Sequence, residues 1–220
     1  MSRLPRFLTV LLTALLLAGP VLATPDKWST DIDRFSAADG EHPPAPDAVL
    51  FVGSSSIRFW TTLAKDFPGV TTINRGFGGS ELADTVFYAD RIVIPYKPRL
   101  VVVYAGENDL WDGKAPEVIL SDFQLLRAKL HAALPATKII YLAIKESPSR
   151  ARIRPQVRLA NRLVAMDCLS DPLCRYVDVA TPMLDSTGHP RSELFREDQL
   201  HLLPAGYAIW TAVLAPYLYQ

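Results

Sequence analysis

The feature that most constrains the fold of this chain is a set of five short runs of apolar residues with few interruptions. Each run has the length of a strand, and most lack the alternation of apolar and polar residues that marks a half-exposed strand. Strands of this kind are buried on both faces, which is typical of a parallel sheet covered by helices. The runs occupy residues 48–53, 70–74, 99–104, 138–144 and 175–180.

Helical patterns lie between these runs. Apolar side chains recur at intervals of three and four residues in segments 115–134, 154–169 and 203–218. The alternation of strands and helices predicts an α/β domain with a five-stranded parallel sheet and helices on both of its faces. Ligands bind at the carboxyl ends of the strands in such folds, so we expect functional groups in the loops that follow the strands.

Two segments precede the first apolar run. Residues 1–23 combine Arg3 and Arg6 with an apolar stretch that ends on the small residue Ala23. This pattern predicts a secretory signal peptide cleaved near Ala23–Thr24, and a retained membrane anchor is the alternative. Residues 24–47 are polar and contain several prolines, so we expect a lead-in along the surface. Residues 48–220 then form a single domain.

Because the chain is expected to be exported, its two cysteines are expected to lie in an oxidising compartment. Cys168 and Cys174 flank a short turn that contains Asp171 and Pro172. In an oxidising compartment such a pair is predicted to form a disulfide. Two cysteines without a histidine nearby in the sequence are too few for a structural zinc site.

The charge of the chain excludes one large class of partners. Its 23 Lys and Arg residues balance its 23 Asp and Glu residues, and the sequence has no basic stripe. Binding of nucleic acid would require a basic surface, so we expect no such partner. After the signal peptide no apolar stretch is long enough to span a bilayer, and no stable membrane span is expected in the mature chain.

Polar and glycine-rich loops follow the predicted strands. The first strand ends at Gly53 and is followed by three serines, Ser54, Ser55 and Ser56. The second is followed by "NRGFGGSEL" and the third by "AGENDLW", and the loop before the last helix reads "REDQLH". Because the carboxyl ends of parallel strands meet at one edge of a sheet, four such loops predict a functional site there.

A serine of the first loop is a candidate nucleophile. A serine hydroxyl becomes reactive only when a neighbouring base accepts its proton. His201 is the histidine best placed for this role, because Asp198 lies three residues before it and can hold the imidazole Nδ1–H. The alternative is structural, with Asp198 as the cap of the following helix and His201 packed beside it.

The same loops contain candidate donors for an oxyanion. Backbone N–H groups at a helix start, as at Ser55, point outward and favour an anion. Gly78 or Gly79 allows the backbone to approach a substrate closely, and Asn108 offers a side-chain amide. Asn108 is also an ordinary turn-forming residue, which is the structural alternative.

Four sequence blocks, in order and at these separations, resemble those of the SGNH (GDSL-type) hydrolases. They are "FVGSSSI", "NRGFGGS", "AGEND" and "DQLH", and the resemblance runs from about Val49 to the C-terminus. It implies a three-layer α/β/α sandwich of the flavodoxin-like type and a catalytic domain that works through a serine. The first block of this family usually reads Gly-Asp-Ser, and Ser54 stands here where the family has aspartate.

The resemblance also implies a role for individual residues. The nucleophile falls on Ser55, and the acid and base of the last block fall on Asp198 and His201. The oxyanion hole combines the backbone N–H groups of Ser55 and Gly79 with the side chain of Asn108.

The leading hypothesis is an exported serine ester hydrolase that uses an acyl-enzyme and needs neither a metal nor an organic cofactor. The expected substrates are short acyl or acetyl esters of small molecules, carbohydrates or lipids. The alternative is a non-catalytic protein that binds a phosphate, a flavin or a glycan on the same scaffold. The arginines at positions 150, 152 and 154 are interpreted as a solvated loop rim rather than as a site for an anionic substrate.

Overall fold

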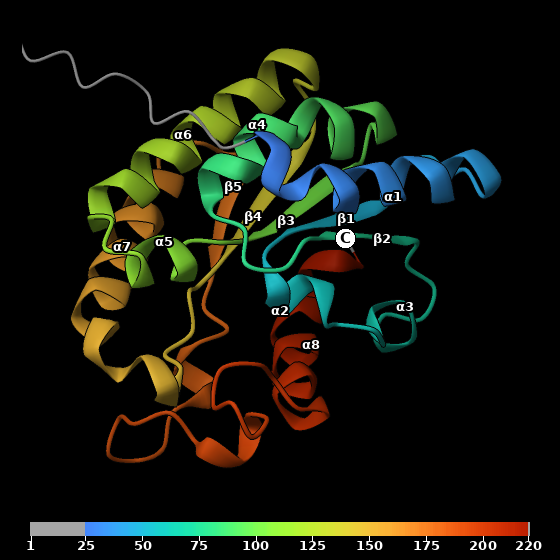
Figure 1. Ribbon diagram of the computed structural model, residues 1–220. Helices are drawn as coiled ribbons and strands as arrows, with labels where there is room; N and C mark the ends of the chain where they lie inside the picture. The colour runs from blue at the N-terminus through green and yellow to red at the C-terminus, as the bar shows by residue number, and fades with distance from the viewer. Residues whose placement is uncertain (1–24, 220) are drawn as a thin grey trace, which may run out of the picture.

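A five-stranded, fully parallel sheet forms the centre of the molecule (Figure 1), as a computed structural model of residues 25–219 shows. The signal peptide expected at residues 1–23 lies outside the described residues. The strand order is β2-β1-β3-β4-β5, which confirms the predicted sheet. The strands are β1 (Val49–Gly53), β2 (Thr72–Gly76), β3 (Leu100–Tyr104), β4 (Lys138–Leu142) and β5 (Cys174–Val177).

Helices cover both faces of the sheet, so the predicted α/β/α sandwich is confirmed (Figure 1). One layer contains α1 (Ser29–Glu41), α4 (Leu82–Ile92), α6 (Pro116–Ala133) and α7 (Arg154–Cys168). The other contains α2 (Ser55–Arg58), α3 (Leu63–Asp66) and α8 (Pro204–Leu218), and the short α5 (Glu107–Trp111) follows β3. Short 3₁₀ segments occupy Pro25–Trp28, Ile94–Tyr96, Pro148–Ile153, Thr181–Met183 and Ser192–Leu194.

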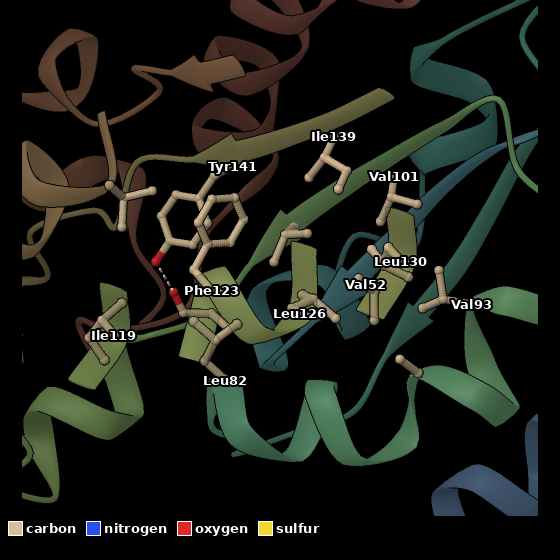
Figure 2. Close-up of a cluster of buried hydrophobic side chains, with 14 of the residues drawn as sticks. Val52, Leu82, Val93, Val101, Ile119, Phe123, Leu126, Leu130, Ile139 and Tyr141 are labelled. Carbon is tan, nitrogen blue, oxygen red and sulfur yellow. Dashed lines mark hydrogen bonds between the residues drawn. The ribbon is translucent and has the colours of Figure 1, made fainter. Parts of the chain in front are cut away.

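The continuous apolar runs exist because each strand contributes to two cores. In β1, Leu50 and Val52 face the layer of α4, α6 and α7, whereas Val49 and Phe51 face the layer of α8. Figure 2 shows the first of these cores, in which Val52 and its neighbours on the sheet meet apolar side chains of α6. Fully burying one such side chain stabilises the fold by about 1.5–3 kcal/mol, so apolar residues fill both faces of β1.

The segment before the first strand contains a helix that the sequence analysis did not predict. The described part of the lead-in, from residue 27 to residue 47, lies largely at the surface as expected, but Trp28 and Ile32 are buried in the core beneath α4 and α6. Arg75 of β2 donates a hydrogen bond to Asp39 of α1 at 2.5 Å. Its guanidinium also lies over the Phe35 ring, with 5.0 Å from Cζ to the ring centroid. Ile32 is the one fully buried residue described within this helix, and ion pairs and the partly buried Phe35 supply its other contacts. A single fully buried position gives too weak a periodic signal to find in the sequence.

The two cysteines lie side by side at the end of α7 and the start of β5. Both are buried free thiols in the structure, and their side chains hydrogen-bond to one another. The disulfide between Cys168 and Cys174 stays a prediction for the oxidised protein. Within residues 25–219, no helix has the length and apolar character needed to cross a membrane.

The ends of three strands are aligned, which brings the candidate loops together. Gly53 of β1 pairs in register with Gly76 of β2 on one side and with Tyr104 of β3 on the other. β1 and β3 are adjacent although β2 separates them in sequence, and this reversal of strand order opens a crevice in doubly wound folds. The loops after β1, β2 and β3 therefore begin next to one another.

Gly53 is the tightest point of this arrangement. Its φ angle of +138° favours glycine, and a Cβ atom at this position would lie 1.9 Å from the carbonyl oxygen of Tyr104. That oxygen also accepts the N–H of Ser54 at 3.1 Å. A side chain at Gly53 would thus force β1 and β3 apart at the point where the site begins.

We predict that Gly53→Ala lowers the free energy of unfolding by at least about 4 kcal/mol or prevents folding, because the new Cβ meets the backbone of β3. Gly113→Ala is the matched control, since Gly113 also has a positive φ but its Cβ would meet no atom within 4 Å. The control should lose only about 1–2 kcal/mol. Urea unfolding followed by circular dichroism measures both values, and equal losses would contradict the prediction.

Candidate active site

Ser55 begins α2 directly after the end of β1 and is half-buried. The carbonyl oxygen of Ser54 accepts the N–H groups of Ile57 and Arg58, which closes the turn. The hydroxyl of Ser54 makes no capping hydrogen bond, so this residue supports the turn through its backbone. The Oγ of Ser55 is left free to face the loop before α8.

Two side chains, one from α8 and one from β2, hydrogen-bond to the backbone of the turn that contains Ser55. The hydroxyl of Tyr207 in α8 donates to the carbonyl oxygen of Ser56 at 2.8 Å. The Nδ2 of Asn74 in β2 donates to the carbonyl oxygen of Ile57 at 2.7 Å, and its Oδ1 accepts the N–H of Gly76. The turn is therefore tied both to the neighbouring strand β2 and to α8, which lies in the same helical layer.

His201 and Asp198 meet Ser55 in one hydrogen-bonded chain. The distance from His201 Nε2 to Ser55 Oγ is 3.0 Å, and that from His201 Nδ1 to Asp198 Oδ2 is 2.6 Å. The other oxygen of Asp198 accepts the backbone N–H groups of Leu200 and His201, both at 2.9 Å. The ring edge of Phe59 packs against the imidazole, with 4.8 Å between ring centroids.

The local hydrogen bonds keep Asp198 ionised. Partial burial would raise the pKa of this carboxyl, but the hydrogen bonds from the His201 side chain and from two backbone N–H groups outweigh it and lower the pKa to about 2. The carboxylate is therefore negative at neutral pH and can stabilise an imidazolium at His201. The structural alternative of a helix cap is wrong, because the N-cap of α8 is Leu203 and receives no side-chain hydrogen bond. Asp198 instead closes a turn within the loop and contacts His201.

The three candidate oxyanion donors lie in the loops after β1, β2 and β3. Among the described residues, the N–H groups of Ser55 and Gly79 have no protein acceptor and remain available. Gly79 is exposed and has a φ of +78°, a conformation that suits glycine. Asn108 lies in α5, where its Nδ2 donates to the carbonyl oxygen of Ser80 at 2.9 Å.

A buried ion pair lies beside Asn108. Glu107 accepts hydrogen bonds from Lys145 at 2.5 Å, from the Tyr104 hydroxyl at 2.9 Å and from the Ser147 hydroxyl at 2.5 Å. Burial alone would raise the pKa of Glu107, but Lys145 and Arg150 outweigh it and hold the pKa below its usual value. Burial lowers the pKa of Lys145 in spite of its partner. Removing either partner would leave a buried charge alone, at a typical cost of about 3–5 kcal/mol.

Asp109 fixes the loop that carries Gly79. Both of its carboxylate oxygens accept the N–H of Leu82, the first residue of α4, at 3.2 Å. Lys114 lies 3.5 Å away and also donates to Glu81 at 2.8 Å. Burial raises the pKa of Asp109 from 3.8 to about 7, since its partners compensate only in part.

Sequence reasoning missed the residues of the β4–α7 loop. The loop contributes Lys145 and Ser147 to the buried ion pair, and Arg150 donates to Asn108 Oδ1 at 3.0 Å. Arg154 donates to the buried Glu146 at 2.5 Å. The interpretation of a solvated rim was therefore wrong for Arg150 and Arg154, because both have buried or half-buried acceptors, and it fits only the exposed Arg152. The sequence signal that could have pointed to this loop is the presence of Lys145 and Ser147 just after the predicted strand 138–144.

The comparisons with known proteins identify the family. The family model of GDSL-like lipases and acylhydrolases matches residues 36–209. This is most of the chain, so the protein belongs to the GDSL-like lipase/acylhydrolase family and is a hydrolase by that membership. A search among curated proteins found no match.

Solved structures share the fold. A Streptococcus pneumoniae protein provisionally assigned as a platelet activating factor is 19% identical, with a TM-score of 0.76, and the match covers 86% of this chain and 92% of that one. A GDSL-like lipase from Bacteroides thetaiotaomicron is 20% identical, with a TM-score of 0.72 and coverage of 86% and 97%. A variant of Axe2, an acetyl-xylooligosaccharide esterase from Geobacillus stearothermophilus, is 16% identical, with a TM-score of 0.64 and coverage of 79% and 94%. At these identities the likeness shows the fold alone.

The raised pKa of Asp109 predicts how stability depends on pH. Because the folded state binds this proton more tightly than the unfolded state, the stabilisation is complete below pH 3.8 and is lost as the pH rises through about 7. We expect the free energy of unfolding of the wild type to fall by roughly 1–3 kcal/mol more between pH 5 and pH 8 than that of Asp109→Asn.

Urea titrations at the two pH values measure this difference. Asp112→Asn removes an exposed carboxyl from the same loop and serves as the control, which should follow the wild type. If Asp109→Asn and the wild type have the same dependence on pH, Asp109 does not hold its proton in the folded protein.

Proposed function

We propose that this protein is a serine ester hydrolase in which Ser55, His201 and Asp198 act together as a triad. The observation that carries the proposal is the hydrogen-bonded chain from Asp198 through His201 to Ser55, with distances of 2.6 and 3.0 Å. These are the contacts that a nucleophile, its base and the group orienting that base require. Membership of the GDSL-like hydrolase family supports the same chemistry.

In the first step Ser55 Oγ attacks the carbonyl carbon of the ester, and the proton of its hydroxyl passes to His201 Nε2. The tetrahedral intermediate collapses, the bond to the alcohol breaks, and His201 returns the proton to the leaving oxygen. In the second step a water attacks the acyl-enzyme and gives a proton to His201, and Ser55 leaves with that proton. The products are an alcohol and a carboxylic acid.

The negative charge on the carbonyl oxygen in both steps needs donors. The N–H groups of Ser55 and Gly79 are proposed for this role, since no protein acceptor satisfies them among the described residues. Asn108 supplies the third donor through Nδ2, which has a second hydrogen beyond the one given to Ser80. Ionised Asp198 stabilises the imidazolium that forms while the oxyanion exists.

The proposed substrates are short acyl or acetyl esters. Axe2, which shares the fold, is named as an acetylxylan esterase, and its catalytic variants replace a serine or a histidine with alanine. The same two residue types form the reacting pair proposed here. An acetyl or short acyl group needs little room beyond the reacting carbonyl, which agrees with the short loops around Ser55.

We also propose that the chain is exported and that its signal peptide is cleaved near Ala23. The support is the order of basic residues, apolar stretch and small residue in positions 1–23. N-terminal sequencing of the protein recovered from the periplasm or medium tests the cleavage site. Its mass before and after reduction tests the Cys168–Cys174 disulfide.

Labelling with a fluorophosphonate tests the activated serine. We expect one adduct, located on Ser55 by peptide mass spectrometry, and no adduct in Ser55→Ala. His201→Ala should retain the fold but lose almost all labelling, because no base accepts the proton of the hydroxyl. A folded wild type without an adduct, or with an adduct at another serine, would rule out the proposed nucleophile.

Asn108→Ala tests the oxyanion donor. The variant should lose roughly 10²–10³-fold in kcat on p-nitrophenyl acetate, because one hydrogen bond to the developing charge is lost. Asn108→Asp keeps the size of the side chain but replaces the donor with a carboxylate, and it should lose at least as much. Wild-type activity in either variant would exclude Asn108 from the oxyanion hole.

A further inference from the structure

Asn108 differs from the other two proposed oxyanion donors because it acts through a side chain. The N–H groups of Ser55 and Gly79 are fixed by the backbone, whereas the amide of Asn108 can turn. An amide turned by half a rotation would present its oxygen to the oxyanion and repel it. The proposed reaction therefore requires neighbouring groups that keep Nδ2 of Asn108, and not its amide oxygen, directed toward the oxyanion.

Two neighbours determine the orientation of this amide. Nδ2 of Asn108 donates to the carbonyl oxygen of Ser80 at 2.9 Å, and Oδ1 accepts a hydrogen bond from Arg150 at 3.0 Å. A carbonyl oxygen can only accept and a guanidinium can only donate. The reversed amide would place oxygen against oxygen and N–H against N–H, so these neighbours together permit one orientation.

Arg150 is itself held in place. Its guanidinium lies over the ring of Trp111, with 5.3 Å from Cζ to the ring centroid. Its backbone N–H donates to the carbonyl oxygen of Ser147 at 3.0 Å, and the hydroxyl of Ser147 donates to Glu107. Glu107 precedes Asn108 in the chain, so Arg150 and Asn108 are anchored to the same buried ion pair.

We propose that Arg150 is a positioning residue of the active site, which holds the amide of Asn108 so that Nδ2 faces the reacting carbonyl. This inference rests on the serine hydrolase function proposed above. A charge-assisted hydrogen bond to Oδ1 also draws electrons from the amide and makes its N–H groups stronger donors. Arg150 thus acts on the oxyanion through Asn108 and does not touch the substrate.

The neighbouring Arg152 provides a matched control. Its guanidinium lies over the same ring, with 4.0 Å from Cζ to the centroid of Trp111, and it donates to the carbonyl oxygen of that residue at 3.3 Å. Arg152 is exposed and has no hydrogen bond to Asn108 among the described contacts. Its removal takes one positive charge from the same surface but leaves the amide of Asn108 as it is.

Steady-state kinetics on p-nitrophenyl acetate compare Arg150→Met with Arg152→Met. We expect Arg150→Met to lower kcat roughly 10- to 100-fold with little change in KM, because a misplaced donor weakens only the transition state. Arg152→Met should stay within about two-fold of the wild type. Equal effects of the two variants would overturn the proposal.

Two further comparisons separate positioning from a direct contact with the substrate. In the Asn108→Ala background, Arg150→Met should cause less than about a two-fold further loss, because the residue on which it acts is gone. The loss caused by Arg150→Met should also be the same on a neutral acetyl ester and on one with a carboxylate in its leaving group. A full additional loss in the double variant, or a rise in KM confined to the anionic ester, would overturn the proposal.

A spectroscopic measurement tests the positioning without any turnover. The side-chain amide of Asn108, assigned in ¹H–¹⁵N spectra by its absence from Asn108→Ala, should shift or broaden in Arg150→Met and stay unchanged in Arg152→Met. Arg150→Lys keeps the positive charge and a hydrogen-bond donor, so it should change the Asn108 resonance less than Arg150→Met does. This variant replaces Arg150→Met in the measurement if the methionine variant does not fold. An unmoved Asn108 resonance overturns the inference, whereas a wild type without ester turnover or fluorophosphonate adduct overturns the proposed function instead.

Discussion

The burial of both sheet faces decides where this protein can carry polar groups. Alternate residues of each central strand enter two separate cores, so a charged side chain within a strand would have to leave water on either side. In these central strands, polar groups are thereby largely confined to the strand ends. Because Gly53, Gly76 and Tyr104 end their strands in register, the polar loops that follow must meet at a single edge.

The β4–α7 loop connects the parts that meet there. Through Lys145, Ser147 and Arg150 it reaches the Glu107–Asn108 pair, and through the N–H and hydroxyl of Ser149 it donates twice to the carbonyl oxygen of Gln199. Gln199 adopts a left-handed conformation between Asp198 and His201. Asn108, the proposed oxyanion donor, and the proposed acid–base pair of Asp198 and His201 are consequently held by one short segment, although they are far apart in sequence.

Much of this arrangement could be predicted from local sequence patterns. The strands follow from apolar runs, and Asp198 and His201 stand out through their spacing of three residues. The strand end points to three adjacent serines, and the family resemblance singles out Ser55 among them. Lys145 and Glu107 could not be paired in advance, because they are 38 residues apart and neither has a periodic signature. The same holds for Arg150 and Asn108, and for the helix α1, whose anchors Trp28 and Ile32 find their contacts only in the folded core.

The position of α8 has a consequence for the order in which the molecule can form. His201 lies 146 residues after Ser55, and α8, which follows it, packs on the sheet face that Val49 and Phe51 line. A growing chain that lacks these last residues has no imidazole beside Ser55, and this sheet face is covered only in part, by Trp60 and Phe67 against Phe51. Such a chain lacks the triad proposed above and exposes apolar side chains of the sheet, so a chaperone has a binding surface until the final helix docks.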